Sequence, residues 1–253
     1  MPDTLGFRMK FGITTPSTNT IVQPEYDDLR PHGVTNHLGR MHIPPMAIRT
    51  AADFDESIRL IAAALDGAVD RVMTCEPGYL ILGISAVSVA GGTRATSDAM
   101  RERMRTRAGR PIGVSHAGDA LPAALKAYGL GPGARIAMFD PYFPSIEGPQ
   151  RSFFKEHGYE VLRVKHLQGA SPVLYAHTSV AEMIDTVLEI DGKDIDAIIQ
   201  FGANLPFARL AGEAERWLRK PVISVNSATY WHACRQNGIL DRRPEYSRLW
   251  SEF

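Results

Sequence analysis

Residues 78–92, GYLILGISAVSVAGG, and residues 196–210, DAIIQFGANLPFARL, share one pattern, in which an apolar run ends in a small polar cluster. In both places a second apolar run follows, opened by a basic residue and a proline and continued by a polar turn and a helix. These second runs are RPIGVSHAGDALPAALKAYGL at 110–130 and KPVISVNSATYWHACRQNGIL at 220–240. Uniformly apolar runs are typical of parallel strands that helices cover on both faces. The repeat therefore predicts two similar halves.

Strands and helices alternate along the rest of the chain. Further strands are expected at FRMKFGITT (7–15), GVTNHLGRMHIP (33–44), ARIAMFD (134–140) and YEVLRVKHL (159–167). Residues 53–70 have apolar side chains at helical spacing, with Asp53 or Asp55 as the expected cap. Such alternation predicts an α/β fold with two pseudo-symmetric halves, each a four-stranded parallel sheet flanked by helices. We expect residues 1–118 plus 225–253 in the first half and 119–224 in the second.

Composition excludes several classes of protein. The 253 residues are 44% hydrophobic and 22% charged, as in ordinary globular enzymes, and the 28 basic residues balance the 28 acidic ones. No basic field is available for nucleic acid. No apolar run approaches the roughly 18 residues of a membrane span, and the start of the chain lacks a signal-like apolar stretch. Two cysteines are too few for a disulfide framework, so a cytoplasmic, reduced setting is expected.

The carboxyl ends of parallel strands are where ligands bind in open α/β sheets. Two halves of this kind place two sets of strand ends on one cleft, and we expect the active site there. The side chains and glycines expected to line it are Gly83, Ser85 and His116 from the first half and Gly202, Asn204 and Asn226 from the second.

Three segments carry a resemblance to a known family: FGITTPSTNTIVQPEYDDL (11–29), RIAMFDPYFPSIEGPQRSFFKEHGYEV (135–161), and FGANLPFARL (201–210) with KPVISVNSATYW (220–231). Together they resemble the maleate isomerase and arylmalonate decarboxylase branch of the aspartate/glutamate racemase superfamily. The resemblance implies chemistry on a small carboxylate held between the halves, with no metal or organic cofactor. It also implies a cysteine at the end of one or two central strands, acting as base, acid or nucleophile.

Both family cysteine positions are glycine in this chain, Gly83 and Gly202. Cys75 precedes its strand and Cys234 lies in the last predicted helix, so neither is expected to substitute. Because a thiolate is the reactive form and glycine has no side chain, we expect cysteine-independent chemistry. The two glycines are expected to leave room for a bulky substrate or for water. Alanine at Cys75 and Cys234 should then leave activity intact.

Other matched positions retain polar groups. The turn after the first strand, Pro16, Ser17, Thr18 and Asn19, is expected to bind a carboxylate with short polar side chains and backbone N–H groups. The resemblance also implies that Asn19, Ser85, Tyr142 and Asn204 hold substrate oxygens, with Ser85 stabilising an oxyanion, and that Ala203 is a substrate-binding residue. Tyr142 is assigned to carboxylate binding more readily than to proton transfer, since the ordinary pKa of tyrosine is about 10.

Histidines supply the remaining candidates for acid–base chemistry. His116 follows a strand that ends at the cleft and titrates near neutral pH, so it is the predicted proton-transfer group. The alternative is that His116 caps the following helix or packs against the other half. His177 lies in a loop that could cover the cleft as a lid.

Three functions stay open from the sequence. The first is a lyase, hydratase or hydrolase that acts on a small mono- or dicarboxylate without cysteine. The second is an ordinary thiol-dependent isomerase or decarboxylase with a displaced nucleophile. The third is a carboxylate-binding or sensing protein without catalysis. A small carboxylate is the expected partner in each, and a homo-oligomer is common among such folds.

Overall fold

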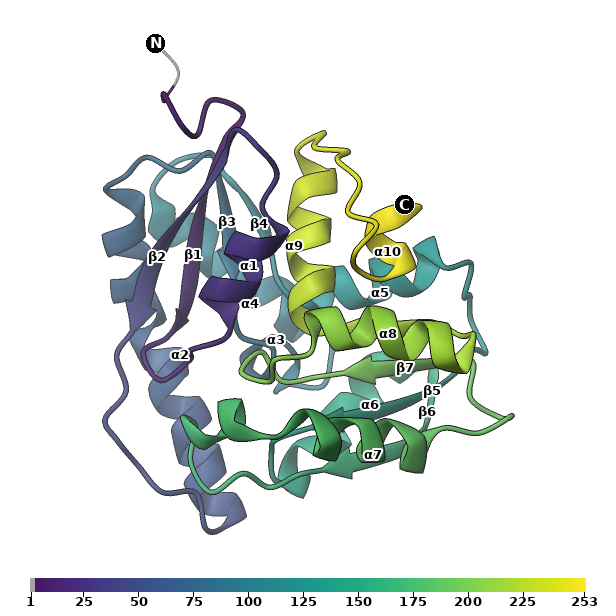
Figure 1. Ribbon diagram of the computed structural model, residues 1–253. Helices are drawn as coiled ribbons and strands as arrows, with labels where there is room; N and C mark the ends of the chain where they lie inside the picture. Colours follow the sequence, from purple (N-terminus) through teal and green to yellow (C-terminus); the bar gives the residue numbers. More distant parts are fainter. Residues whose placement is uncertain (1–2) are drawn as a thin grey trace.

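Apolar strands build two separate four-stranded parallel sheets in the computed structural model, which describes residues 3–253 (Figure 1). The two sheets have the same strand order. In each, the second strand along the chain pairs with one side of the first strand, and the third strand pairs with the other side and carries the fourth at its outer edge. In spatial order the strands are β2 (Val34–Met41), β1 (Met9–Pro16), β3 (Tyr79–Leu82), β4 (Gly113–Ser115), and β6 (Glu160–His166), β5 (Arg135–Asp140), β7 (Ala197–Gln200), β8 (Val222–Ser224). The predicted fold class is confirmed.

Helices cover both sheets and follow the strands in the predicted order. Within residues 3–253, none of them is long and apolar enough to cross a lipid bilayer. Those of the first sequence half are α1 (Val22–Leu29), α2 (Ala51–Met73), α3 (Ala86–Val89), α4 (Arg94–Ala108) and α5 (Ala117–Ala127). The later ones are η1 (Pro144–Ile146), α6 (Glu147–Glu156), η2 (Leu174–His177), α7 (Val180–Ile190), α8 (Ala208–Leu218), α9 (Val225–Gln236) and α10 (Arg248–Ser251).

Helix α9 joins the two halves. It follows β8 of the second sheet but packs against α1, β3 and β4 of the first half and against α5 (Figure 1). Its Tyr230 ring lies 4.8 Å from that of Tyr26 and 5.5 Å from that of Phe11 between ring centroids. The last helix, α10, packs on α9 through Trp250, whose indole N–H donates to Ser227 O (3.2 Å). This crossing agrees with a second half that ends near residue 224, although boundaries at 118 and 225 stay a prediction.

Local differences from the predicted boundaries have simple causes. Helix α2 begins earlier than expected, because Thr50 is its N-cap and accepts from Asp53 N–H, while the Asp53 carboxylate accepts from Thr50 N–H. This reciprocal pair is a capping box, so Asp53 is the third helical residue rather than the cap, and Asp55 is not the cap either. Strand β8 ends at Ser224, which places Asn226 in the first turn of α9.

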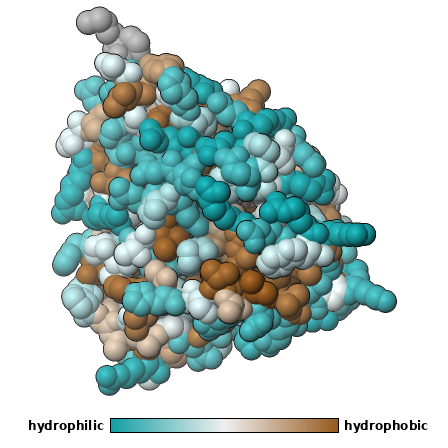
Figure 2. All heavy atoms as spheres, in the orientation of Figure 1, coloured by the Kyte–Doolittle hydropathy of each residue, from teal (hydrophilic) through white to brown (hydrophobic). Residues whose placement is uncertain are grey.

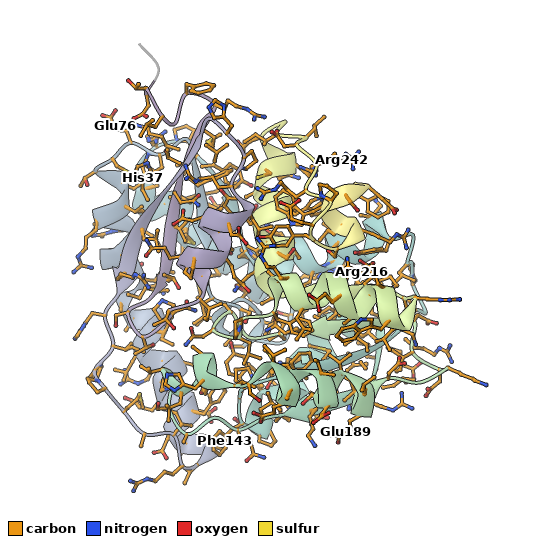
Figure 3. The ribbon with its side chains drawn as sticks, viewed as in Figure 1. His37, Glu76, Phe143, Glu189, Arg216 and Arg242 are labelled. Carbon is orange, nitrogen blue, oxygen red and sulfur yellow. The ribbon has the colours of Figure 1, made fainter. Side chains whose placement is uncertain are left out.

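The face shown in Figure 2 is mainly hydrophilic and carries apolar side chains in its lower half, and side chains fill most of the space between the ribbons of the two halves (Figure 3). Helix α7 carries exposed apolar residues, Val180 and Leu188, on its outer face. The inner face of the same helix packs Met183, Val187 and Ile190 into the core of the second half.

Candidate active site

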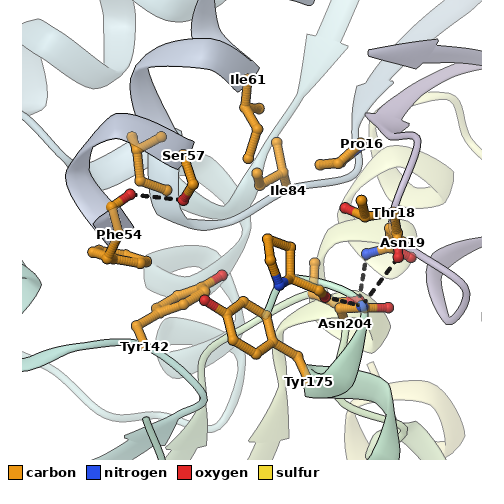
Figure 4. A pocket seen from close by; sticks show the side chains of 13 residues that line it. Pro16, Thr18, Asn19, Phe54, Ser57, Ile61, Ile84, Tyr142, Tyr175 and Asn204 are labelled. Atoms are coloured by element: carbon orange, nitrogen blue, oxygen red, sulfur yellow. Dashed lines mark hydrogen bonds between the residues drawn. The ribbon is translucent and has the colours of Figure 1, made fainter. Parts of the chain in front are cut away.

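A cavity lies between the two halves, where β1, β3, β5 and β7 end and where the sequence places the site. Its volume is about 30 Å³, small beside the roughly 300 to 1,000 Å³ of typical ligand pockets. Figure 4 shows its walls, in which α2 and the turn after β1 face Tyr142 and Tyr175 of the second half. The lining residues are Pro16, Thr18, Asn19, Phe54, Ser57, Ile58, Ile61, Ile84, Tyr142, Pro172, Tyr175, Ala203 and Asn204.

Ser85 lies directly behind the Tyr142 hydroxyl and joins the two halves. Its Oγ is 3.1 Å from Tyr142 Oη and accepts a hydrogen bond from the Gly202 backbone N–H, also at 3.1 Å. Ser85 is fully buried and does not itself line the cavity. Two hydroxyl groups and one backbone N–H thus meet beside the cavity, so the structure brings together three of the predicted residues. Donors arranged in this way can stabilise negative charge on an oxygen.

A buried carboxylate fixes Tyr142. Asp140, the last residue of β5, accepts from Tyr142 N–H (2.9 Å) and from Gln150 Nε2 (2.8 Å), and its Oδ1 lies 2.9 Å from His166 Nδ1. Burial lowers the pKa of His166, but the neighbouring Asp140 and Glu147 carboxylates outweigh this effect and raise it. Asp140 and His166 hold the segment from β5 into the cavity wall and act on the site through Tyr142.

The titratable side chains that line the cavity are both tyrosines, among the residues that the structure describes. Burial raises the pKa of Tyr142 well above 10, and the hydrogen bond from Ser85 lowers it by less. Burial also raises the pKa of Tyr175. Both phenols therefore keep their protons at neutral pH and can donate, but neither can act as a base. The hydroxyl of Tyr175 is buried without a hydrogen-bond partner.

The two glycines at the family cysteine positions do not open the expected space. A Cβ atom at Gly202 would lie 2.4 Å from Pro141 Cδ. The residue also has φ = +121°, a backbone angle that residues other than glycine rarely adopt. A Cβ at Gly83 would lie 2.9 Å from Val22 Cγ1. Val22 and Pro141 already occupy that volume, and neither glycine lines the cavity. The expectation that these glycines make room for substrate or water is therefore wrong.

The side-chain amides of Asn19 and Asn204, which were predicted to bind a carboxylate, form hydrogen bonds between the two halves instead. Asn19 Nδ2 donates to Ala203 O (3.1 Å), and its Oδ1 accepts from the first amides of α1. Asn204 Oδ1 accepts from Thr20 N–H (2.9 Å), and its Nδ2 donates to Pro172 O (2.8 Å). These amides line the cavity, yet in this conformation their hydrogen bonds shape its walls.

The Ser17 hydroxyl is also engaged elsewhere, because it accepts from Ile43 N–H (3.1 Å). The Ser17 residue is exposed and does not line the cavity. From the predicted turn, Pro16, Thr18 and Asn19 do line it.

Glu25 extends this set of contacts between the halves. Its Oε1 accepts from Ala208 N–H (2.8 Å) at the start of α8, and its Oε2 accepts from Asn226 Nδ2 (2.7 Å). Asn226 Nδ2 also donates to Ala203 O (3.0 Å), so Asn226 is a link between α1 and the cavity wall. Although the Glu25 residue is only partly buried, its carboxyl group is enclosed, and burial raises its pKa from 4.5 to about 7.

This shift predicts that the protein loses stability as the pH rises. A folded-state pKa above the unfolded value means that the folded protein binds the proton more tightly. The contribution is therefore full below about pH 4.5 and is lost as the pH rises to about 7. A shift of this size corresponds to about 3 kcal/mol. Thermal unfolding of Glu25→Gln between pH 4.5 and 8 should show a flatter profile than the wild type. Parallel profiles for the two proteins would show that Glu25 is not the group responsible.

His116 lies apart from the cavity and caps helix α5. Its Nδ1 accepts from Gly118 N–H (3.0 Å), and its Nε2 lies 3.3 Å from Asp119 Oδ2. The side chain is fully buried, and burial together with the charge of Arg101 lowers its pKa to about 4. His116 does not line the cavity, so its position supports the capping alternative. Proton transfer by His116 stays a prediction without a contact to support it.

Neither cysteine is close to the Ser85–Tyr142 pair. Cys75 follows α2 at the amino-terminal side of the first sheet, and its Sγ donates to Val72 O (3.1 Å). Cys234 is buried inside α9, and burial raises its pKa to about 12. Neither residue lines the cavity. A displaced thiol nucleophile is therefore not available in this arrangement.

Several wall residues were missed by sequence reasoning. Phe54, Ser57, Ile58 and Ile61 form the α2 wall, and their helical spacing looks the same for a cavity as for a core. The loop after β6 reaches over the site with Tyr175, whereas His177, the predicted lid residue, is exposed and does not line the cavity.

The sequence profile of the arylmalonate decarboxylase family matches residues 57–250. The chain belongs to this family. No curated protein sequence matches it. Among solved structures, the fold is similar to a maleate cis-trans isomerase from Nocardia farcinica bound to TRIS, with a TM-score of 0.84 and 19% identity over 96% of this chain and 98% of the other.

Two further solved structures share the fold. A maleate isomerase from Pseudomonas putida S16, solved with maleate, has a TM-score of 0.81 and 19% identity over 96% of this chain and 98% of its own. An arylmalonate decarboxylase has a TM-score of 0.71 and 20% identity over 95% of this chain and 98% of its own. At these identities the likeness shows the fold, and both kinds of enzyme have it.

Proposed function

We propose that this protein is a lyase that decarboxylates a small carboxylic acid with an apolar substituent, without a thiol and without a cofactor. The observation that carries the proposal is that Tyr142 and Tyr175 are the titratable side chains of the cavity wall, and that both are acids. Racemisation or thiol-dependent isomerisation needs a group that removes a proton from carbon or adds to it. Loss of CO₂ needs neither, because the carbon–carbon bond supplies the electron pair.

Charge stabilisation is what decarboxylation demands from the protein. When CO₂ leaves, the electron pair is delocalised as an enolate onto the remaining carboxyl group. A substrate oxygen that replaces the Ser85–Tyr142 hydrogen bond would accept from the hydroxyls of Ser85 and Tyr142, while Ser85 Oγ keeps the hydrogen bond that it accepts from Gly202 N–H. Two hydroxyl donors, one of them held in place by Gly202 N–H, stabilise that charge at little reorganisation cost, and each contributes about 3 to 4 kcal/mol in comparable oxyanion sites.

The apolar wall defines the other part of the substrate. Phe54, Ile58, Ile61 and Ile84 line the side of the cavity that faces the two tyrosines. No Lys, Arg or His lines the cavity in the part of the chain that the structure describes. A carboxylate placed against such a wall loses hydration, which favours its conversion to neutral CO₂. The pocket chemistry fits a malonate with an aryl or alkyl group, in keeping with the family.

Substrate access requires movement. The cavity is too small for a substituted malonate, and contacts between the halves close it: Ile48 N–H donates to Ala170 O (2.8 Å), and the Ser145 hydroxyl donates to Asp55 (3.0 Å). We propose that the start of α2 and the 170–177 segment separate to admit the substrate and close over it.

A second candidate function is carboxylate binding without catalysis, favoured by the lack of a thiol at both family positions, Gly83 and Gly202. One experiment separates the two. The purified protein is incubated with phenyl-, benzyl- and alkyl-substituted malonates and with maleate, and CO₂ and organic products are measured together with binding. CO₂ release from substituted malonates supports the lyase. Binding without any product supports the second candidate, and conversion of maleate to fumarate contradicts both.

A further inference from the structure

Tyr175 has a hydroxyl group with no structural use. Among the described residues it is the one tyrosine whose hydroxyl is buried without a hydrogen-bond partner. Other buried tyrosines use theirs: the Tyr159 hydroxyl donates to Leu130 O (3.2 Å), and the Tyr79 hydroxyl lies 2.9 Å from Ser115 Oγ. A buried hydroxyl without a partner costs stability, and phenylalanine would avoid that cost. A functional use for the hydroxyl is therefore the more economical explanation.

Local packing holds the Tyr175 ring in one place. It meets the Tyr142 ring edge to face, with centroids 5.8 Å apart and planes at 75°. On another side it lies against Gly169, where a Cβ atom would be 2.4 Å from Tyr175 Cδ1. Both hydroxyls point from the second half toward the first, into the cavity (Figure 4). Tyr142 shares its hydroxyl with Ser85, whereas the Tyr175 hydroxyl is enclosed without a partner and can donate to a ligand once the cavity opens.

We propose that Tyr175 is the general acid that protonates the carbanion left by decarboxylation. This inference rests on the proposed lyase function. It assigns the two phenols different work, because Tyr142 binds the enolate oxygen together with Ser85 while Tyr175 delivers a proton to carbon. Tyr175 thus takes the role that a thiol would have in a family site with cysteine.

The step balances without a further reagent. The bond between the α-carbon and the departing carboxylate breaks, CO₂ leaves, and the electron pair stays on the α-carbon and its enolate oxygens. The Tyr175 O–H bond then breaks and a C–H bond forms, which leaves the monocarboxylate product and a tyrosine phenolate. Water returns a proton to the phenolate when the site opens. A phenol, whose ordinary pKa is about 10, carries its proton at neutral pH, so that the proton is in place when the carbanion forms.

Stereochemistry tests the assignment more sharply than rate. A malonate with one phenyl and one methyl group gives a planar carbanion, and a single fixed acid protonates it from one face. We expect the wild type to form one enantiomer of the product, with one deuterium per molecule in D₂O. Tyr175→Phe should lower kcat by about 100-fold and give a product close to racemic, because water then supplies the proton.

The matched control is Tyr159→Phe, which removes a buried phenol hydroxyl outside the cavity and should leave kcat and the enantiomer ratio unchanged. Thermal unfolding distinguishes a catalytic role from a structural one. Tyr175→Phe loses no hydrogen bond and should be at least as stable as the wild type. Wild-type rate and enantiomer ratio in Tyr175→Phe overturn the inference alone. A wild type that releases no CO₂ from any substituted malonate contradicts the proposed function and the inference with it.

Discussion

Replacement of Ser85 by alanine is expected to reduce kcat/KM for the proposed decarboxylation by about 100- to 1,000-fold. The Ser85 hydroxyl accepts from Gly202 N–H and lies 3.1 Å from the Tyr142 hydroxyl, so its removal takes one of the two hydroxyl donors from the site and leaves the Tyr142 hydroxyl without its partner. Steady-state kinetics with a substituted malonate measures the effect. Because the interactions are made with charge that develops during the reaction, most of the loss should appear in kcat.

Serine 88 provides the control for this variant. Ser88 lies in the short helix α3, which Ser85 precedes as the N-cap residue, and it is also buried, but its hydroxyl donates to the backbone oxygen of Ile84 and contacts neither Tyr142 nor Gly202. Ser88→Ala should retain near wild-type kcat. Ser85→Ala also leaves a buried N–H without a partner, which costs about 1 to 3 kcal/mol of stability, so both variants are compared at a temperature where each is folded. Equal kcat values for the two variants would contradict the charge-stabilising role of Ser85.

Introduction of cysteine at Gly202 is expected to destabilise the protein and not to create a thiol-dependent enzyme. The residue has φ = +121°, and the new Cβ would lie 2.4 Å from Pro141 Cδ in a rigid ring. Backbone strain of about 1 to 3 kcal/mol adds to an overlap of similar cost. The free energy of unfolding should therefore fall by about 2 to 6 kcal/mol. Because Gly202 N–H is also the donor to Ser85, the distortion should abolish activity as well.

Denaturant unfolding measures the stability of Gly202→Cys against two other glycine variants. Gly148→Ala, in α6, has open space around the new Cβ and should be neutral or slightly stabilising. Gly83→Cys should be milder than Gly202→Cys, since its ordinary φ adds no strain and its tightest contact, at 2.9 Å, is with the Val22 side chain rather than with a rigid ring. Wild-type stability for Gly202→Cys would show that Pro141 can withdraw and that the site accommodates the family thiol.

The fold could be predicted from the sequence because it depends on a hydrophobic pattern that occurs twice in the chain. Two copies of the same strand pair predict two similar parallel sheets, and the turn after β1 and Tyr142 after β5 fall at the carboxyl ends of strands, where ligands bind in each sheet. The hydrogen-bond partners of the polar side chains could not be predicted in this way. Asn19 and Ala203 are 184 residues apart, and a sequence does not disclose that the amide of one is used by the carbonyl of the other.

The site residues that the sequence did not predict were missed for similar physical reasons. The α2 wall repeats the spacing of an ordinary buried helix face, and only the tertiary structure distinguishes a core from a cavity. Tyr175 stands in a segment without periodicity, whose position is set by contacts with Gly169 and Tyr142. Gly83 and Gly202 led to a wrong prediction of open space. A missing side chain indicates free volume only when no neighbouring atoms fill it, and here Val22 and Pro141 do.

Activity of a protein without cysteine tests the central claim most directly. Cys75 and Cys234 are the two cysteines of the chain, so Cys75→Ala combined with Cys234→Ala removes every thiol. Both lie outside the cavity, and thermal unfolding checks that the variant remains folded. CO₂ release from substituted malonates at a rate close to that of the wild type is the predicted result. An active wild type whose folded cysteine-free variant releases no CO₂ would contradict catalysis by the Ser85–Tyr142–Gly202 site.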